Sequence, residues 1–213
     1  DGPTHAGSFD ITYLCTVPNI ILMAPSDEEM LESAIITSMS IDHCPSAFRY
    51  PRGTANKISN KKSNPKILKI GKGRIVKKAK KPAKHTLAIL CLGTRLSELL
   101  KLAKELENIH NIGITIADAI FAKPIDKELI NNLAKTHNMI LTIEEGSIGG
   151  FAAHVQQHML ETTLLDNSKT RLRSMFYPDI FIDQASQEEQ NKEIDFNIES
   201  IADKIKKIFD LKL

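Results

Sequence analysis

Short apolar runs alternate along the chain with segments whose apolar residues recur at helical spacing. Residues 19–24 form an apolar run, as a buried parallel strand would. Ser26 and Glu29 follow in the pattern of a capping box, and apolar residues then recur at helical spacing as far as Met39. Residues 46–50 are the next predicted strand. This region therefore has the pattern of a strand–helix–strand unit of an α/β domain.

The same alternation resumes in the second half of the chain. The predicted strands are residues 87–92, 112–119, 139–143 and 172–176. The predicted helices are residues 96–106, 126–136, 150–165 and 198–209. Strands that alternate with helices indicate a mainly parallel sheet with helices on both faces, joined by right-handed crossovers. The predicted fold class is therefore α/β, in two units.

A basic segment separates the two units. Residues 54–84 contain twelve Lys or Arg and no acidic residue. Because the whole chain has a net charge of +2, the rest of the chain has a net charge of −10. Such a block can bind nucleic acid, but this one lacks interleaved aromatic residues. We interpret it as a solvated linker that includes a short strand within residues 67–73, and we expect no nucleic-acid partner. A second interpretation is that its charge steers a phosphate-bearing substrate.

Composition bounds the class of protein. With 42% hydrophobic and 25% charged residues, the chain is typical of globular proteins and not of disordered ones. No apolar run is long enough for a membrane span, so we expect no membrane partner. Cys15, Cys44 and Cys91 lack paired or metal-like spacing. This pattern fits reduced cysteines in a cytoplasmic protein.

The first candidate site is the segment Asp1-Gly2-Pro3-Thr4-His5. Gly2 permits unusual backbone angles and Pro3 fixes its own φ, so the segment is predicted to be a stiff loop. Such a loop can aim a carboxylate and an imidazole at one point, where His5 would exchange protons and Asp1 would orient a hydroxyl. The alternative is an ordinary surface turn, because short motifs carry false positives.

The second candidate is Arg49-Tyr50-Pro51-Arg52-Gly53, at the end of an apolar segment. A guanidinium offers a planar fork of donors that matches a phosphate or a carboxylate, so Arg49 and Arg52 are candidates for binding an anionic substrate. Structural ion pairs use the same chemistry, and the local sequence does not separate the two roles.

Two further patterns carry weaker signals. Residues 144–150, Glu-Glu-Gly-Ser-Ile-Gly-Gly, join a predicted strand to a predicted helix, where doubly wound sheets bind ligands, but the glycine spacing misses the dinucleotide fingerprint. His154 and His158 would share one face of a helix, as metal ligands sometimes do. No third ligand stands near them, so we interpret them as histidines on a helix surface and predict no metal site.

Read in order, these motifs resemble the 1-deoxy-D-xylulose-5-phosphate synthases, a branch of the transketolase-like thiamine diphosphate enzymes. The resemblance rests on Asp1–His5, residues 17–20, residues 24–29 and Arg49–Gly53, and it covers residues 1–55 closely. The Arg-Tyr-Pro-Arg-Gly ending favours this branch over transketolase itself. The resemblance implies that residues 1–56 are the end of the pyrimidine-binding domain, 57–84 a basic linker, and 85–213 the C-terminal domain.

The resemblance also implies a reaction and roles. Pyruvate would lose carbon dioxide, and the two-carbon unit would join D-glyceraldehyde 3-phosphate, giving a precursor for isoprenoids, thiamine and pyridoxal. His5 would move protons, Asp1 would contact the acceptor's hydroxyl, and Arg52 would bind its phosphate with support from Arg49. The loop at residues 144–150 would be chiefly structural, near a homodimer contact. In this family Gly-Ser usually precedes the next histidine, whereas Ala152-Ala153 precede His154 here.

Thiamine diphosphate and Mg²⁺ would be held mainly by domains outside this chain. In this family a Gly-Asp-Gly motif and an activating glutamate lie upstream of the Asp-Gly-Pro-Thr-His loop. We therefore expect the chain to be the C-terminal part of a larger enzyme and to be inactive alone. The alternatives are transketolase, the beta subunit of a 2-oxo acid dehydrogenase, a nucleic-acid-binding protein that uses residues 57–84, and a dimerisation module.

Overall fold

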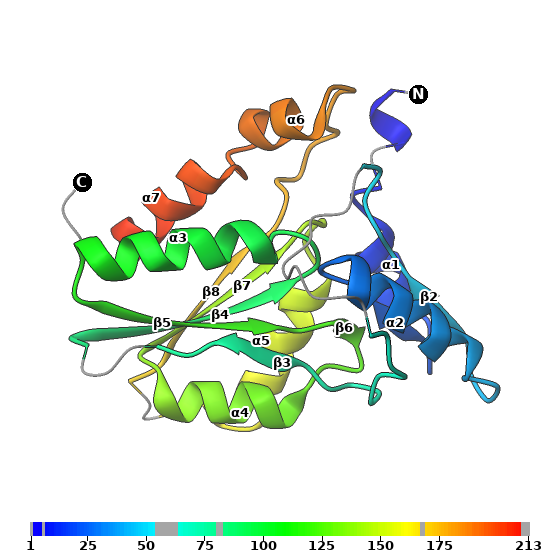
Figure 1. Ribbon diagram of the computed structural model, residues 1–213, viewed down its shortest axis with the longest axis horizontal. Coiled ribbons are helices and arrows are strands. Elements are labelled where there is room, and N and C mark those ends of the chain that lie inside the picture. The colour runs from blue at the N-terminus through cyan, green and yellow to red at the C-terminus, as the bar shows by residue number, and fades with distance from the viewer. Residues whose placement is uncertain (1, 6, 54–63, 80–82, 167–168, 210–213) are drawn as a thin grey trace.

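The computed structural model describes residues 2–5, 7–53, 64–79, 83–166 and 169–209 (Figure 1). Its helical segments are η1 (Pro3–His5), α1 (Asp10–Cys15), α2 (Glu28–Met39), α3 (Leu96–Ile109), α4 (Lys127–Thr136), α5 (Phe151–Glu161), α6 (Gln187–Glu193) and α7 (Ile198–Ile208). Its strands are β1 (Ile21–Met23), β2 (Ser46–Phe48), β3 (Arg74–Lys77), β4 (His85–Leu92), β5 (Ile112–Asp118), β6 (Phe121–Lys123), β7 (Met139–Glu144) and β8 (Arg171–Met175). This order confirms the predicted α/β class.

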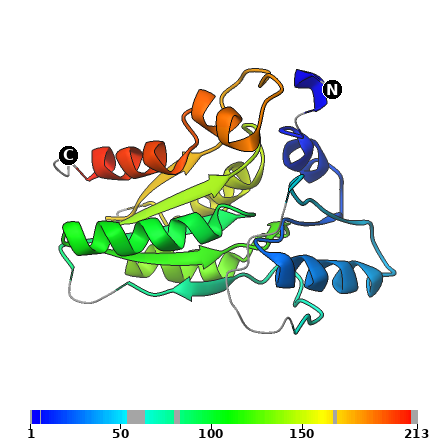
Figure 2. The ribbon, with the colours of Figure 1, turned by 45° about the horizontal axis from the view of Figure 1, so that its top comes forward.

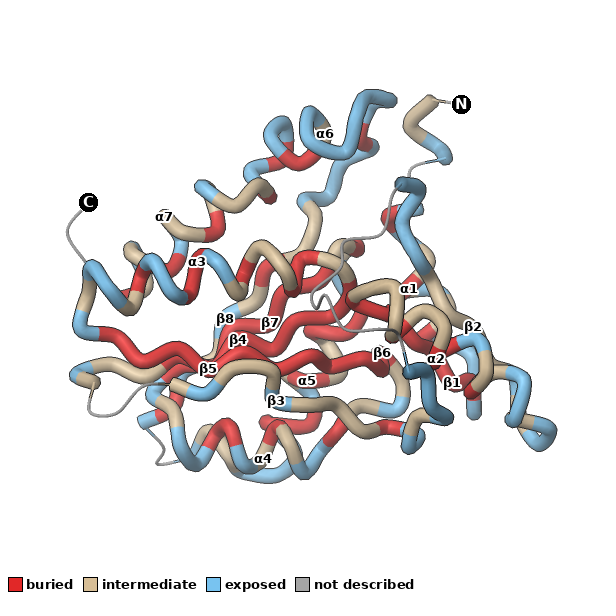
Figure 3. The backbone as a smooth tube through the Cα atoms, viewed as in Figure 1, coloured by how far each residue is buried: buried red, intermediate tan, exposed pale blue. Residues whose placement is uncertain are grey.

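Five strands form the larger sheet, in the order β3-β5-β4-β7-β8. β4, β5, β7 and β8 pair in parallel, whereas β3 runs antiparallel to β5 at one edge. β5 and β7 are buried along their whole length (Figure 3). Their mostly apolar sequences fit this burial, because helices on both faces remove both sides of a parallel sheet from water. The predicted mainly parallel sheet is confirmed.

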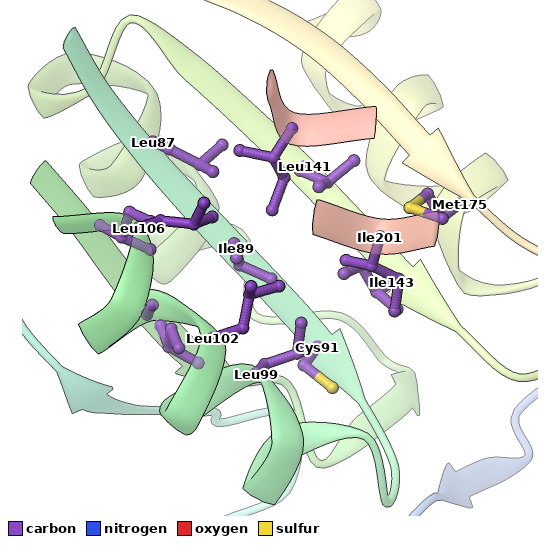
Figure 4. Packing of buried hydrophobic residues seen from close by; sticks show 14 of the residues in the cluster. Leu87, Ile89, Cys91, Leu99, Leu102, Leu106, Leu141, Ile143, Met175 and Ile201 are labelled. Atoms are coloured by element: carbon purple, nitrogen blue, oxygen red, sulfur yellow. The ribbon is translucent and has the colours of Figure 1, made fainter. Parts of the chain in front are cut away.

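Helices cover both faces of the larger sheet (Figure 1). On one face, Leu99 of α3 and Ile201 of α7 belong to the same buried cluster as Ile89 of β4 (Figure 4). On the other face, Val155 of α5 packs in a second cluster, which includes Leu90 of β4. Neighbouring residues of one strand therefore serve two separate cores, since successive side chains of a strand point to opposite faces.

A smaller sheet joins the two units of the chain. Its strand order is β2-β1-β6, with β1 and β2 parallel and β6 antiparallel to β1. β6 follows β5 in sequence, so the second unit contributes a strand to the sheet of the first. The amide of Ala24 also donates to the carbonyl of Ile120 at 2.8 Å. The junction is thus built partly from backbone hydrogen bonds.

Asp118, at the end of β5, forms a buried polar anchor at this junction. Its Oδ2 accepts from Ser26 Oγ at 2.7 Å and from Arg74 Nε at 3.1 Å. Burial raises the pKa of Asp118, while Arg74 and Ser26 act in the opposite direction. Arg74 Nη2 also lies 3.5 Å from Asp27 Oδ2, so one arginine links β3, β5 and the start of α2.

The predicted capping box at Ser26 and Glu29 is wrong. The Ser26 hydroxyl is already donated to Asp118, and the side chain of Asp27 instead accepts from the amide of Met30 at 2.8 Å. Asp27 is thus the N-cap of α2. Both residue types favour the N-cap position, and a distant partner of Ser26 decided between them.

The strand predicted within residues 67–73 is also wrong, because the strand in the basic segment is β3, Arg74–Lys77. Residues preceding it lie along α2 instead, where the amide of Leu68 donates to Thr37 Oγ1 at 2.8 Å. β3 then covers the edge of β5, and Lys77 Nζ pairs with the buried Glu107 at 2.7 Å. Part of the predicted linker is therefore integrated into the larger sheet.

One smaller difference concerns a helix. α5 ends at Glu161, four residues before the predicted boundary at residue 165. Within the described ranges, no helix combines the length and the apolar character that crossing a membrane requires.

Candidate functional site

The two motif segments meet at one open cavity of about 620 Å³. Its wall comes from the N-terminal turn, the segment after β2, and the segment that leads into α6. Figure 2 shows the N-terminal turn opposite the loop before α6, although these elements are far apart in sequence. The lining includes three of the predicted site residues, His5, Arg49 and Arg52. The fourth, Asp1, lies outside the described residues.

His5 ends the short turn η1. The amide of His5 donates to the carbonyl of Gly2 at 3.2 Å, and Gly2 has a φ of 78°, a value that glycine adopts without strain. The imidazole is exposed, and its Nδ1 lies 3.1 Å from Thr4 Oγ1. One ring nitrogen thus has a local partner, and the ring stands at the cavity wall.

Arg49 is occupied by contacts within the protein. Its Nε lies 2.9 Å from Asp10 Oδ2, and its Nη1 donates to the carbonyl of Glu145 at 2.7 Å. Nη2 lies 3.4 Å from the carbonyl of Gly7. This guanidinium therefore ties β2 to α1 and to the loop after β7, and most of its donors are already engaged.

Arg52 differs from Arg49 in both exposure and partners. It is exposed, and its side chain makes no ion pair with any residue in the described part of the chain. Its backbone is held instead, because Gln187 Nε2 donates to the carbonyl of Arg52 at 2.6 Å. The two arginines have similar local sequences, but only Arg52 presents an uncommitted guanidinium at the cavity.

The sequence reasoning missed several cavity residues. Ser8 is buried, and its hydroxyl has no hydrogen-bond partner among the described residues. Burial is the main cause of a raised pKa at Tyr177, and the nearby Glu145 carboxylate raises this pKa further. The phenol therefore keeps its proton at neutral pH. Gln184 and Gln187 come from the segment around the start of α6. No local pattern marks these residues, because each reaches the cavity only through the tertiary fold.

The loop at residues 144–150 has a structural role at the start of α5. The buried Glu144 accepts from the amides of Phe151 and Ala152 at 2.8 and 2.7 Å. Burial, partly offset by these two amides, raises the pKa of Glu144 to about 7. The helix amides that could bind an anion are thus taken by a carboxylate of the chain itself.

The two histidines of α5 lie in different surroundings. His158 is buried, and its Nε2 lies 2.8 Å from Asn131 Oδ1, so the interpretation of His158 as a surface histidine is wrong. His154 is half-buried, and burial lowers its pKa. No three His, Cys, Asp or Glu side chains cluster as a cation site in the ranges that the structure describes. These residues by themselves do not fit a metal-bound diphosphate.

Comparisons with known proteins agree on one family. Residues 1–57 match the transketolase pyrimidine-binding domain, and residues 64–201 match the transketolase C-terminal domain. A split-gene transketolase described as an inactive β4 tetramer is similar in structure, with a TM-score of 0.81 and 20% identity over 99% of this chain and 64% of that chain. A transketolase mutant from Pichia stipitis matches with a TM-score of 0.67 and 17% identity, over 97% of this chain and 28% of that chain. The predicted fold, a pyrimidine-binding domain followed by a C-terminal domain, is confirmed.

Proposed function

The chain belongs to the transketolase family through its pyrimidine-binding and C-terminal domains, and we propose that it is part of a 1-deoxy-D-xylulose-5-phosphate synthase. This enzyme converts pyruvate and D-glyceraldehyde 3-phosphate into carbon dioxide and 1-deoxy-D-xylulose 5-phosphate. The supporting observation is that Arg49–Gly53, the motif that favours this branch, meets the turn that carries His5 at one cavity, where Arg52 has no ion pair among the described residues. A free guanidinium suits a substrate that carries a phosphate.

His5, Arg49 and Arg52 have roles that suit their surroundings, whereas the role of Asp1 rests on the resemblance alone. Arg52 binds the acceptor's phosphate, while Arg49, already paired with Asp10, holds the segment around it in place. His5 exchanges protons near the reacting carbonyl, since its exposed ring stands at the cavity wall. Asp1 contacts the acceptor's hydroxyl.

Parts of the enzyme outside this chain would complete the binding site for thiamine diphosphate. The resemblance assigns the metal and the diphosphate to domains outside this chain. When bound, the cofactor supplies the electron sink for breaking and forming carbon–carbon bonds. A homodimer in the cytoplasm and inactivity of this chain alone belong to the same proposal and rest on the resemblance.

The Arg52→Ala variant of the complete enzyme tests the phosphate role. We expect the KM for glyceraldehyde 3-phosphate to rise about 10- to 100-fold, as loss of charge-assisted hydrogen bonds implies, with little change in the KM for pyruvate. Steady-state kinetics with each substrate varied in turn measure both constants. An equal loss for the two substrates would rule out the phosphate role.

His5→Ala tests the proton-transfer role. We expect kcat to fall about 10²- to 10⁴-fold, the usual contribution of a positioned acid or base, while circular dichroism reports an intact fold. Unchanged turnover would remove His5 from the chemistry.

Transketolase is the second candidate, because both solved structures described above are transketolases. The two candidates use different donors. Turnover with pyruvate and glyceraldehyde 3-phosphate supports the synthase, whereas turnover only with a ketose phosphate supports transketolase.

A further inference from the structure

Two glutamines from the C-terminal unit reach both motif loops of the N-terminal unit. Gln187 Nε2 donates to the carbonyl of Arg52 at 2.6 Å. Gln184 Oε1 accepts from the amide of Gly2 at 3.1 Å. Both contacts are to backbone atoms, so they fix the course of each loop and leave the side chains of Arg52 and His5 available to the cavity.

The segment that carries these glutamines is itself firmly held. Ser186 and Glu189 form a reciprocal capping box at the start of α6, which sets the position of the first helical residue, Gln187. On either side, Ile182 and Ile194 are buried in the main core of the larger sheet. Gln187 therefore extends from a helix start whose position is fixed. Its side-chain amide can for this reason restrain the loop that carries Arg52.

The contact from Gln187 matters because the side chain of Arg52 has no ion pair of its own to fix it among the described residues. The residue is also exposed. A long, free side chain on a free backbone loses the most conformational entropy when it binds a ligand, and fixing the backbone in advance reduces that loss. A cation placed within a few tenths of an ångström also keeps the forked geometry that a phosphate requires.

We propose that Gln187 is a positioning residue for phosphate recognition: its side-chain amide fixes the backbone of Arg52 so that the guanidinium meets the acceptor's phosphate. Gln184 does the same for the turn that carries His5. The C-terminal domain thereby helps to shape a substrate site whose binding groups lie in the pyrimidine-binding domain. The inference rests on the proposed function, since it assigns a phosphate-bearing acceptor to Arg52.

The test uses the complete enzyme and the variant Gln187→Met, which keeps the length of the side chain but removes the amide. The matched control is Gln157→Met, because Gln157 is an exposed glutamine of α5 whose amide donates to Glu161. For Gln187→Met we expect the KM for glyceraldehyde 3-phosphate to rise about fivefold, the effect of losing one net hydrogen bond. The KM for pyruvate and kcat stay within about twofold of the parent enzyme.

A second measurement does not depend on activity. Hydrogen–deuterium exchange of the peptide that covers residues 49–53 is followed with and without inorganic phosphate. In Gln187→Met we expect faster exchange, and about fivefold more phosphate for the same protection. Values equal to those of Gln157→Met would overturn the inference, and so would an equal rise of KM for both substrates. If the parent enzyme does not turn over pyruvate with glyceraldehyde 3-phosphate, the proposed function fails, while exchange and phosphate protection still decide the role of Gln187.

Discussion

Glu144 allows a sharp prediction about stability and pH. Its side chain lies at the end of β7, is 1% exposed, and accepts from the amides of Phe151 and Ala152 at the start of α5. Burial raises its pKa from 4.5 to about 7 in the folded protein. The folded state therefore binds this proton more tightly than the unfolded state does.

The sign and the size of the effect follow from this difference. The stabilisation linked to this proton is complete below pH 4.5, the unfolded value, and is lost as the pH rises through about 7. A difference of two to three pKa units corresponds to about 3 kcal/mol in the free energy of unfolding. Glu144→Gln removes the titration, because the amide is neutral throughout. It also leaves one helix amide without an acceptor, at a pH-independent cost of about 1–3 kcal/mol.

Urea unfolding at several pH values from 4.5 to 8 measures the effect. The free energy of unfolding of the parent minus that of Glu144→Gln should fall by about 3 kcal/mol across this range. Glu105→Gln, at an exposed site on α3, controls for the loss of one acidic side chain. Parallel pH profiles for the parent and Glu144→Gln would refute the reasoning, since they would mean that Glu144 titrates alike in both states.

Two further predictions concern packing and charge. A Cβ at Gly150 would lie 2.6 Å from Glu144 Oε2, so Gly150→Ala should lower the free energy of unfolding by about 1–3 kcal/mol. The control is Gly53→Ala, because the nearest atom to a Cβ at Gly53 lies 3.8 Å away. Equal losses of unfolding free energy for the two variants in urea would contradict this prediction. Arg74→Met leaves the buried Asp118 without its cation and should lower the free energy of unfolding by about 3 kcal/mol. This value is at the low end of the range for breaking a buried ion pair, because the side chain of Arg74 is 38% exposed. A loss below about 0.5 kcal/mol in thermal unfolding would show that Asp118 needs no cation.

Much of the fold could be predicted because its signal is local. Continuous apolar runs such as those of β4 and β7 identify strands that are buried on both faces, and the apolar spacing of α3 identifies the face that packs on them. The strand in the basic segment was misplaced because β3 is an edge strand, whose position depends on pairing with β5 and not on its own hydrophobic pattern.

The candidate site was predictable in part. The two motifs identified His5, Arg49 and Arg52, and all three line one cavity. Gln184 and Gln187 could not be found, since an exposed glutamine in a loop or at a helix start carries no signal for what its amide will contact.

The sequence by itself determined which segments form helices or strands and where the two motifs lie. Helical spacing, apolar runs and stiff turns all arise from residues that are neighbours in the chain. The tertiary structure alone decided which charged side chains are paired within the protein. Arg49 and Arg52 are chemically equivalent in sequence, yet Asp10 pairs with the first and leaves the second available. It likewise decided that Glu144 is a buried acceptor with a raised pKa. Pairing and burial depend on distances in space between residues far apart in the chain, and only the folded arrangement fixes those distances.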